Sequence, residues 1–159
     1  MSLTRADLTP YSGDGLLVYD TDTKLEWLNL SLTSHRSCVD AQASPFMTQH
    51  RFGFATGPQI TALWSHAGIA QQGGPVGPAS PGTAIGVEVL LHLLGGYVFS
   101  PPHEWSRGLA PEGPFTADTP VVAFELHLNR TASPAAGYGD SGAGSWNAGQ
   151  RYENTGVYL

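Results

Sequence analysis

The order of apolar and polar residues along the chain predicts a hairpin and a separate strand. Two apolar runs, 16–19 and 25–30, flank the turn-forming residues 20–23, which is typical of a β-hairpin. Over 121–128, large apolar residues alternate with smaller or polar ones, which predicts a half-buried strand. The segment 156–159 is a candidate for a short closing strand.

Two segments predict long helices. Thr56 and Gln59 have the spacing of a capping box, and Pro58 falls in the first turn, where its missing N–H costs nothing. An apolar face follows at helical spacing, and Gly68 stands where a helix commonly ends. The members of that face are Ile60, Leu63, Trp64 and Ala67. A second helix, 83–94, is apolar nearly all round and is therefore expected to be buried.

Long loops are expected in much of the remaining chain. Segments 70–82, 100–120 and 131–150 show no regular pattern, and only a short helix is expected at 37–43. Each loop exceeds ~12 residues, a length that is uncommon and often functional. Charged residues make up 13% of the chain, about half the usual share of ~25%, beside 20 glycines and 12 prolines. We therefore expect one folded domain, 1–159, with long uncharged loops.

The charge distribution excludes two classes of partner. The chain has seven basic residues, and they are scattered along the sequence. A nucleic-acid surface and a polybasic membrane anchor both need clustered cations. No apolar run approaches the ~18 residues of a membrane span. Nucleic acid and membrane are therefore not expected among the partners.

Cysteine content and the N-terminus leave the location open. Cys38 is the only cysteine, so no intramolecular disulfide can form. The first ten residues include Asp7 and lack an apolar core, so they do not read as a signal peptide. The protein is expected to be extracytoplasmic or secreted if a leader has been removed, and cytoplasmic otherwise.

The residues around the predicted hairpin carry a family resemblance. The segment that begins V-Y-D-T-D-T-K-L-E-W resembles the opening of bacterial secreted domains that often precede a C-terminal exosortase-type sorting signal. That opening reads roughly D-x-x-T-x-L-E-W-L-D-L-T, followed by a Ser-led helix. Asn29 replaces the usual Asp. The matching residues are Asp20, Thr23, Leu25, Glu26, Trp27, Leu28 and Leu30.

A second block of the chain resembles the same family. The segment F-G-F-A-T-G-P-Q-I-T-A-L-W-S-H-A-G-I is similar to the family's G-W-R-Y-A-T-x-x-E-I-x-x-L-x-x-x-A-G. Phe54 replaces the second aromatic, and Gln59 replaces the capping Glu. Residues 152–159 look like the closing strand, although the L-V-R ending is absent. The matching residues of the second block are Ala55, Thr56, Ile60, Leu63, Ala67 and Gly68.

The order of these blocks is also similar to the C-terminal domain of Legionella collagen-like proteins. The resemblance implies an α+β domain with a C-type lectin-like fold: a small antiparallel sheet, two main helices, long irregular loops, and adjacent N- and C-terminal strands. The hairpin 16–30 should then pack beside the closing strand 156–159. Trp27 should be buried near the helix that follows Thr56, in contact with Leu63 or Trp64.

No metal or other cofactor is expected. Lectins of this fold commonly hold sugar through Ca²⁺ with E-P-N or Q-P-D and W-N-D signatures. Here Trp146 and Asn147 are not followed by Asp, and Ca²⁺ needs six to eight oxygen ligands. Formylglycine-generating enzymes of the wider fold need two cysteines, and only Cys38 is present. None of the six histidines forms a metal-binding pair, so His66 and His92 are expected to serve packing.

Aromatic and polar residues of the predicted loops supply the candidate site. A sugar or protein ligand would use aromatic faces together with hydrogen-bonding groups. The candidate ligand-binding residues are Trp105, Arg107, Tyr138, Asp140, Trp146 and Asn147. The same aromatics could instead pin long loops to the core. The leading hypothesis is a non-enzymatic binding or surface-associated module.

Two other function classes stay open. A hydrolase could use His103 and Glu104, which are neighbours in the sequence, together with Asp140. A structural domain could form homo-oligomers through an apolar patch. A convergent pocket would favour the hydrolase, and a large buried interface would favour the oligomer.

Overall fold

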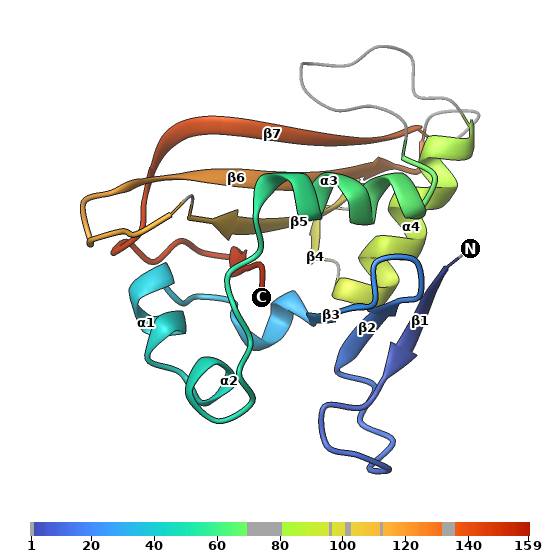
Figure 1. Cartoon of the computed structure of the whole chain (residues 1–159). Helices are drawn as coiled ribbons and strands as arrows, with labels where there is room; N and C mark the ends of the chain where they lie inside the picture. Colours follow the sequence, from blue (N-terminus) through green and yellow to red (C-terminus); the bar gives the residue numbers. More distant parts are fainter. Residues whose placement is uncertain (1, 70–80, 96, 101–102, 112, 132–135) are drawn as a thin grey trace.

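The computed structural model describes residues 2–69, 81–95, 97–100, 103–111, 113–131 and 136–159, and it shows an α+β architecture with two sheets (Figure 1). The first sheet has the order β1-β2-β3, and both of its pairings are antiparallel. Its strands are β1 (Leu3–Ala6), β2 (Leu17–Asp20) and β3 (Leu25–Leu28). The predicted hairpin is therefore confirmed as β2 and β3.

The second sheet is built from the C-terminal half of the chain. Its strands are β4 (Tyr97–Ser100), β5 (His103–Ala110), β6 (Pro120–Asn129), β7 (Ala136–Asn147) and β8 (Gly156–Val157). The order is β4-β5-β6-β7 with antiparallel pairing, and β8 lies parallel to β5 beside Gly108 and Leu109. The predicted strand at 121–128 is the buried part of β6.

The helices connect the two sheets. They are the short 3₁₀ helix η1 (Leu30–Leu32), then α1 (Cys38–Gln42), α2 (Pro45–Thr48), α3 (Gly57–His66) and α4 (Pro81–Leu94). The capping box predicted at Thr56 is present, since Thr56 and Gln59 exchange side-chain and backbone hydrogen bonds. Ser37 and Asp40 cap α1 in the same way. The predicted helices at 37–43, after Thr56 and at 83–94 are confirmed.

The core lies on both faces of the second sheet. On one face Phe124, Leu126 and Leu128 of β6 pack in one cluster with buried residues of α3 and α4. On the other face Val121 and Ala123 join a second cluster that includes residues of α1 and β8. Around residues 121–124, the alternation predicted for β6 therefore places successive side chains in two packed layers, one on each face of the sheet.

The end of the chain lies against the hairpin as expected, but the expected adjacency of the N- and C-terminal strands is wrong, because β1 is an edge strand of the first sheet and β8 runs parallel to β5 in the second. The backbone N–H of Leu28 donates to the carbonyl of Leu159 over 3.0 Å, and Ala55 N–H donates to the Tyr158 carbonyl over 3.1 Å. The Trp27 side chain is 2% exposed and shares the core cluster of Leu63 and Trp64. The predicted burial of Trp27 and its place near α3 are confirmed.

Two of the three predicted loops are wrong. The segment 100–120 contains β5, and the segment 131–150 contains β7. Neither strand is rich in the β-branched residues that favour strands, and β7 carries several glycines. Hydrogen bonds to β6 pair the backbone N–H and C=O groups of both strands, although their residues favour the strand conformation only weakly. The second sheet is accordingly larger than the small sheet that was expected.

The segment 70–82 lies mostly outside the described residues, although α4 already begins at Pro81. Cys38 is buried at the start of α1, and this burial raises the pKa of its thiol to about 12, as fits a small core residue. Among the residues that the structure describes, no helix combines the length and apolar character needed to cross a membrane.

Candidate functional site

Several of the candidate ligand-binding residues meet on one face of the second sheet, where β5, β6 and β7 run side by side (Figure 1). Trp105 and Arg107 are two positions apart on β5, so they share a face. The register places Trp105 opposite His127 and Arg107 opposite Glu125 on β6. We call Trp105, Arg107, Glu125, His127 and Trp146 the sheet-face cluster.

Arg107 lies at the centre of the sheet-face cluster. Its guanidinium carbon is 4.7 Å from the ring centroid of Trp105 and 4.6 Å from that of Trp146. Both distances are within the range of a cation–π interaction. Arg107 Nε also donates a hydrogen bond to Glu125 Oε1. The two indole rings and the carboxylate therefore hold the guanidinium in one place.

Glu125 joins Arg107 to His127. Its second oxygen, Oε2, lies 2.9 Å from His127 Nε2. Partial burial opposes ionisation of Glu125, but the hydrogen bonds from His127 and Arg107 and their charges outweigh it, so its pKa lies below the ordinary value. The side chains of Arg107, Glu125 and His127 are 20–30% exposed. The cluster is thus an ordered, charged surface that solvent still reaches.

A second aromatic contact fixes Trp146. The rings of Trp146 and Tyr152 meet edge to face with their centroids 4.5 Å apart. The Tyr152 hydroxyl accepts a hydrogen bond from the backbone N–H of Asn147 and donates one to Gln150 Oε1. Asn147, a predicted ligand residue, therefore contributes its backbone to the turn that positions Tyr152.

Two predicted ligand residues are placed only by their backbone. The register sets Tyr138 opposite His127 and Asp140 opposite Glu125, next to the sheet-face cluster. The side chains of Tyr138 and Asp140 lie outside the described part of the structure. The prediction for these two residues stays a prediction.

The strand register places two of the candidate hydrolase residues, Glu104 and Asp140, on opposite faces of the sheet. Glu104 lies opposite Leu128, which faces the core covered by α3 and α4. Asp140 lies opposite Glu125, which is on the other face of the sheet. The Glu104 carboxylate binds the Arg130 guanidinium through two hydrogen bonds of 2.9 and 3.1 Å. The geometry therefore gives Glu104 a role in an ion pair and gives no support to its cooperation with Asp140.

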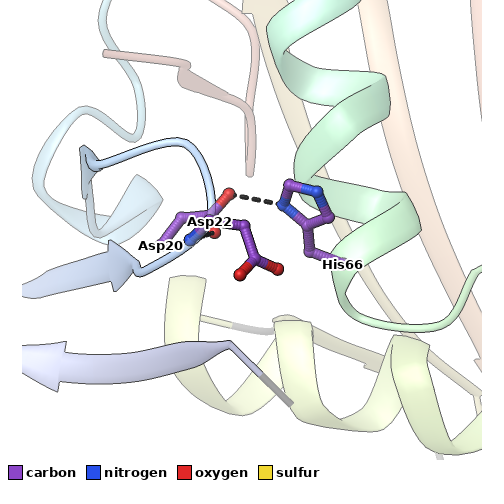
Figure 2. A group of neighbouring side chains, drawn as sticks. All are labelled: Asp20, Asp22 and His66. Carbon is purple, nitrogen blue, oxygen red and sulfur yellow. Dashed lines mark hydrogen bonds and ion pairs between the residues drawn. The ribbon is translucent and has the colours of Figure 1, made fainter.

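A different cluster lies at the turn of the first hairpin and was missed from the sequence. His66, the last residue of α3, places Nδ1 2.7 Å from Asp20 Oδ2 (Figure 2). Asp20 is fully buried, and it also accepts hydrogen bonds from the Thr23 hydroxyl and the Asp22 N–H. Burial opposes ionisation of Asp20, but the bonds from His66 and Thr23 hold its pKa below the usual range. His66 was expected to serve packing, and the structure instead gives it a buried acidic partner.

A hollow of about 290 Å³ lies apart from both clusters. It opens between β3 and the segment before α3, and both apolar and polar side chains line it. Trp27, Phe54 and Leu159 belong to its wall, and it shares no residue with the sheet-face cluster. It provides an alternative place for a ligand that experiments on the cluster can distinguish.

Comparison with known proteins adds no relative: no family model, curated protein or solved structure matches the chain.

Glu125→Gln is expected to lower the free energy of unfolding by about 1–2 kcal/mol at neutral pH, because it weakens the charge-assisted hydrogen bonds to Arg107 and His127. The folded-state pKa of Glu125 is depressed. Its ionised form therefore contributes stability that is fully present above the unfolded-state pKa of about 4.3 and lost as the pH falls through the folded-state pKa. Urea unfolding of both proteins should show a gap that shrinks steadily below about pH 4. A gap that stays constant down to about pH 2.5 would show that the carboxylate is not stabilised in this way.

Proposed function

We propose that this protein is a non-enzymatic binding module that holds a carbohydrate against the sheet-face cluster. The observation that carries the proposal is the Arg107 guanidinium, fixed between the indole rings of Trp105 and Trp146 and bound to Glu125. Sugars present both C–H faces and hydroxyl groups. Aromatic rings match the first, and planar charged groups that donate or accept hydrogen bonds match the second.

The order within the cluster supports binding. Each polar member is already held by a neighbour, so a ligand would not have to immobilise a free arginine or glutamate side chain. Arg107 has five N–H donors and Glu125 has two acceptor oxygens, so both retain hydrogen-bonding capacity beyond their mutual contact. A preordered surface of this kind loses little conformational entropy when a flexible sugar binds.

We also propose that the fold is C-type lectin-like and that the chain belongs with the bacterial secreted domains that its opening resembles. The support is the contact between the hairpin and the end of the chain, through Leu28 and Leu159, and the order of elements along the chain, in which the helices follow the hairpin and precede the second sheet. An experimental structure in which β3 lies away from Leu159 would contradict this assignment.

Substitutions in the sheet-face cluster should weaken glycan binding at least tenfold. A glycan array of neutral and acidic oligosaccharides selects a ligand, and calorimetric titration then measures its affinity. Trp105→Ala removes an aromatic face, and Arg107→Gln removes the charge between the two rings. Far-UV circular dichroism and thermal unfolding establish that each variant is folded.

Tyr11→Asn is the matched control for these variants. Tyr11 is a fully exposed aromatic residue in the loop between β1 and β2, at a positive φ of 64° that Asn tolerates. Its substitution should leave glycan affinity within twofold of the original protein. An array without a ligand at millimolar glycan concentration, or an equal loss of affinity in all three variants, would overturn the proposal. Recovery of a protein partner in place of a glycan would overturn the choice of ligand class.

A further inference from the structure

Three side chains of types that commonly bind metal ions gather around the turn between β2 and β3. Asp20 ends β2, Asp22 lies within the turn, and His66 ends α3. One possible ligand atom from each residue can be chosen so that all three atoms lie within 4.8 Å of one another. Figure 2 shows the Asp22 carboxylate beside the hydrogen bond that joins the Asp20 side chain to the His66 ring.

The three residues differ in burial in a way that suits an ion. Asp20 is fully buried and fixed by the backbone of its own turn. Asp22 is exposed, and the His66 side chain is 26% exposed. An open polar hollow, lined by Ser2, Thr21, Asp22 and His66, adjoins the two more exposed residues. One ligand is thus anchored, two can adjust, and water has room to complete the coordination.

We propose that Asp20, Asp22 and His66 form a binding site for a divalent first-row transition-metal ion such as Zn²⁺. Two carboxylate oxygens and one imidazole nitrogen are ligands that such ions accept at about 2.0–2.2 Å. Ca²⁺ fits less well, because it takes six to eight oxygen ligands and rarely includes imidazole. The site is separate from the sheet-face cluster, and this proposal does not depend on carbohydrate binding.

Metal binding at this site would replace the hydrogen bond between His66 and Asp20. His66 Nδ1 and Asp20 Oδ2 are 2.7 Å apart, a separation that fits a hydrogen bond between them. Two ligands of one tetrahedral ion stand about 3.3 Å apart, so the pair would open slightly as the ion enters. The Nδ1 lone pair then binds the metal, and any proton held between Nδ1 and Asp20 passes to solvent.

The test is a calorimetric titration of the untagged protein with Zn²⁺ at about pH 7.5. We expect one ion per chain and a rise in the melting temperature when the ion is present. His66→Ala and Asp22→Asn should each weaken Zn²⁺ binding at least tenfold. His103→Ala is the matched control, because His103 is also exposed but lies on β5, and it should leave the affinity within twofold.

One further readout separates this site from nonspecific surface binding. Excess Ca²⁺ should not displace Zn²⁺. Absence of saturable binding up to about 1 mM Zn²⁺, or binding that survives His66→Ala or Asp22→Asn unchanged, would overturn the proposal.

Discussion

Trp27→Ala is expected to lower the free energy of unfolding by about 3–5 kcal/mol, the usual cost of truncating a large core aromatic residue. Trp27 lies in the core cluster that joins β3 to α3 and the second sheet. Its ring meets Tyr158 edge to face, with 6.4 Å between the ring centroids. The substitution would therefore leave a cavity where the hairpin meets the end of the chain.

Trp27→Phe is the matched control for this prediction, because it keeps an aromatic ring beside Tyr158. In the described part of the structure the buried Trp27 indole N–H has no hydrogen-bond partner, so phenylalanine gives up ring area without breaking a hydrogen bond. We expect less than half the cost of the alanine variant. Urea unfolding followed by far-UV circular dichroism measures both, and equally small costs would contradict the central place of Trp27 in the core.

Gly156→Ala is expected to destabilise the protein by about 1–3 kcal/mol through overpacking. A Cβ atom at this position would lie 2.6 Å from the Leu30 carbonyl oxygen and 3.0 Å from the Thr33 hydroxyl. Both neighbours belong to the contact between η1 and β8, in which the buried Thr33 hydroxyl accepts a hydrogen bond from Val157 N–H. Relief of the clash would have to move β8 away from η1.

Gly53→Ala provides the comparison for Gly156→Ala. An added Cβ at Gly53 meets no atom within 4 Å, and its φ lies outside the positive range that strains alanine. Its effect on unfolding should stay within about 0.5 kcal/mol, as for other exposed substitutions. Equal melting temperatures for the two alanine variants would contradict the close approach of β8 to η1.

The sequence predicted those elements in which neighbouring residues themselves favour the observed conformation. The hairpin turn, the capping box at Thr56 and the alternation in β6 each combine a residue preference with a matching burial pattern. The strands β5 and β7 lack such agreement. Their hydrogen bonds are made with β6, far away in the sequence, and no local pattern shows that partner.

The candidate site was predictable to a similar extent. Aromatic and polar residues gathered in the C-terminal half pointed to Trp105, Arg107 and Trp146, and strand alternation accounts for the first two sharing a face. The stacking of Trp146 on Arg107 depends on how β7 ends, which sequence spacing does not show. Glu125 is one of the polar residues that alternate with large apolar ones in the predicted strand 121–128, and nothing in that pattern shows that it binds Arg107 and His127.

The pairing of Asp20 with His66 had a weaker signal. The turn formers 20–23 predicted the hairpin turn, in which Asp20 accepts hydrogen bonds from Asp22 and Thr23. His66 reaches the same carboxylate only because α3 packs back over the hairpin. Contacts of this kind follow from tertiary packing and not from residue spacing.

Indole N–H signals in a ¹H–¹⁵N spectrum test the central claim most directly, because the four tryptophans divide between the proposed site and the core. Titration with the glycan selected by the array should shift the signals of Trp105 and Trp146. The signals of buried Trp27 and Trp64 should remain in place. Shifts confined to Trp27, which lines the separate hollow, or unchanged signals for Trp105 and Trp146 at saturating glycan, would contradict carbohydrate binding at the sheet-face cluster.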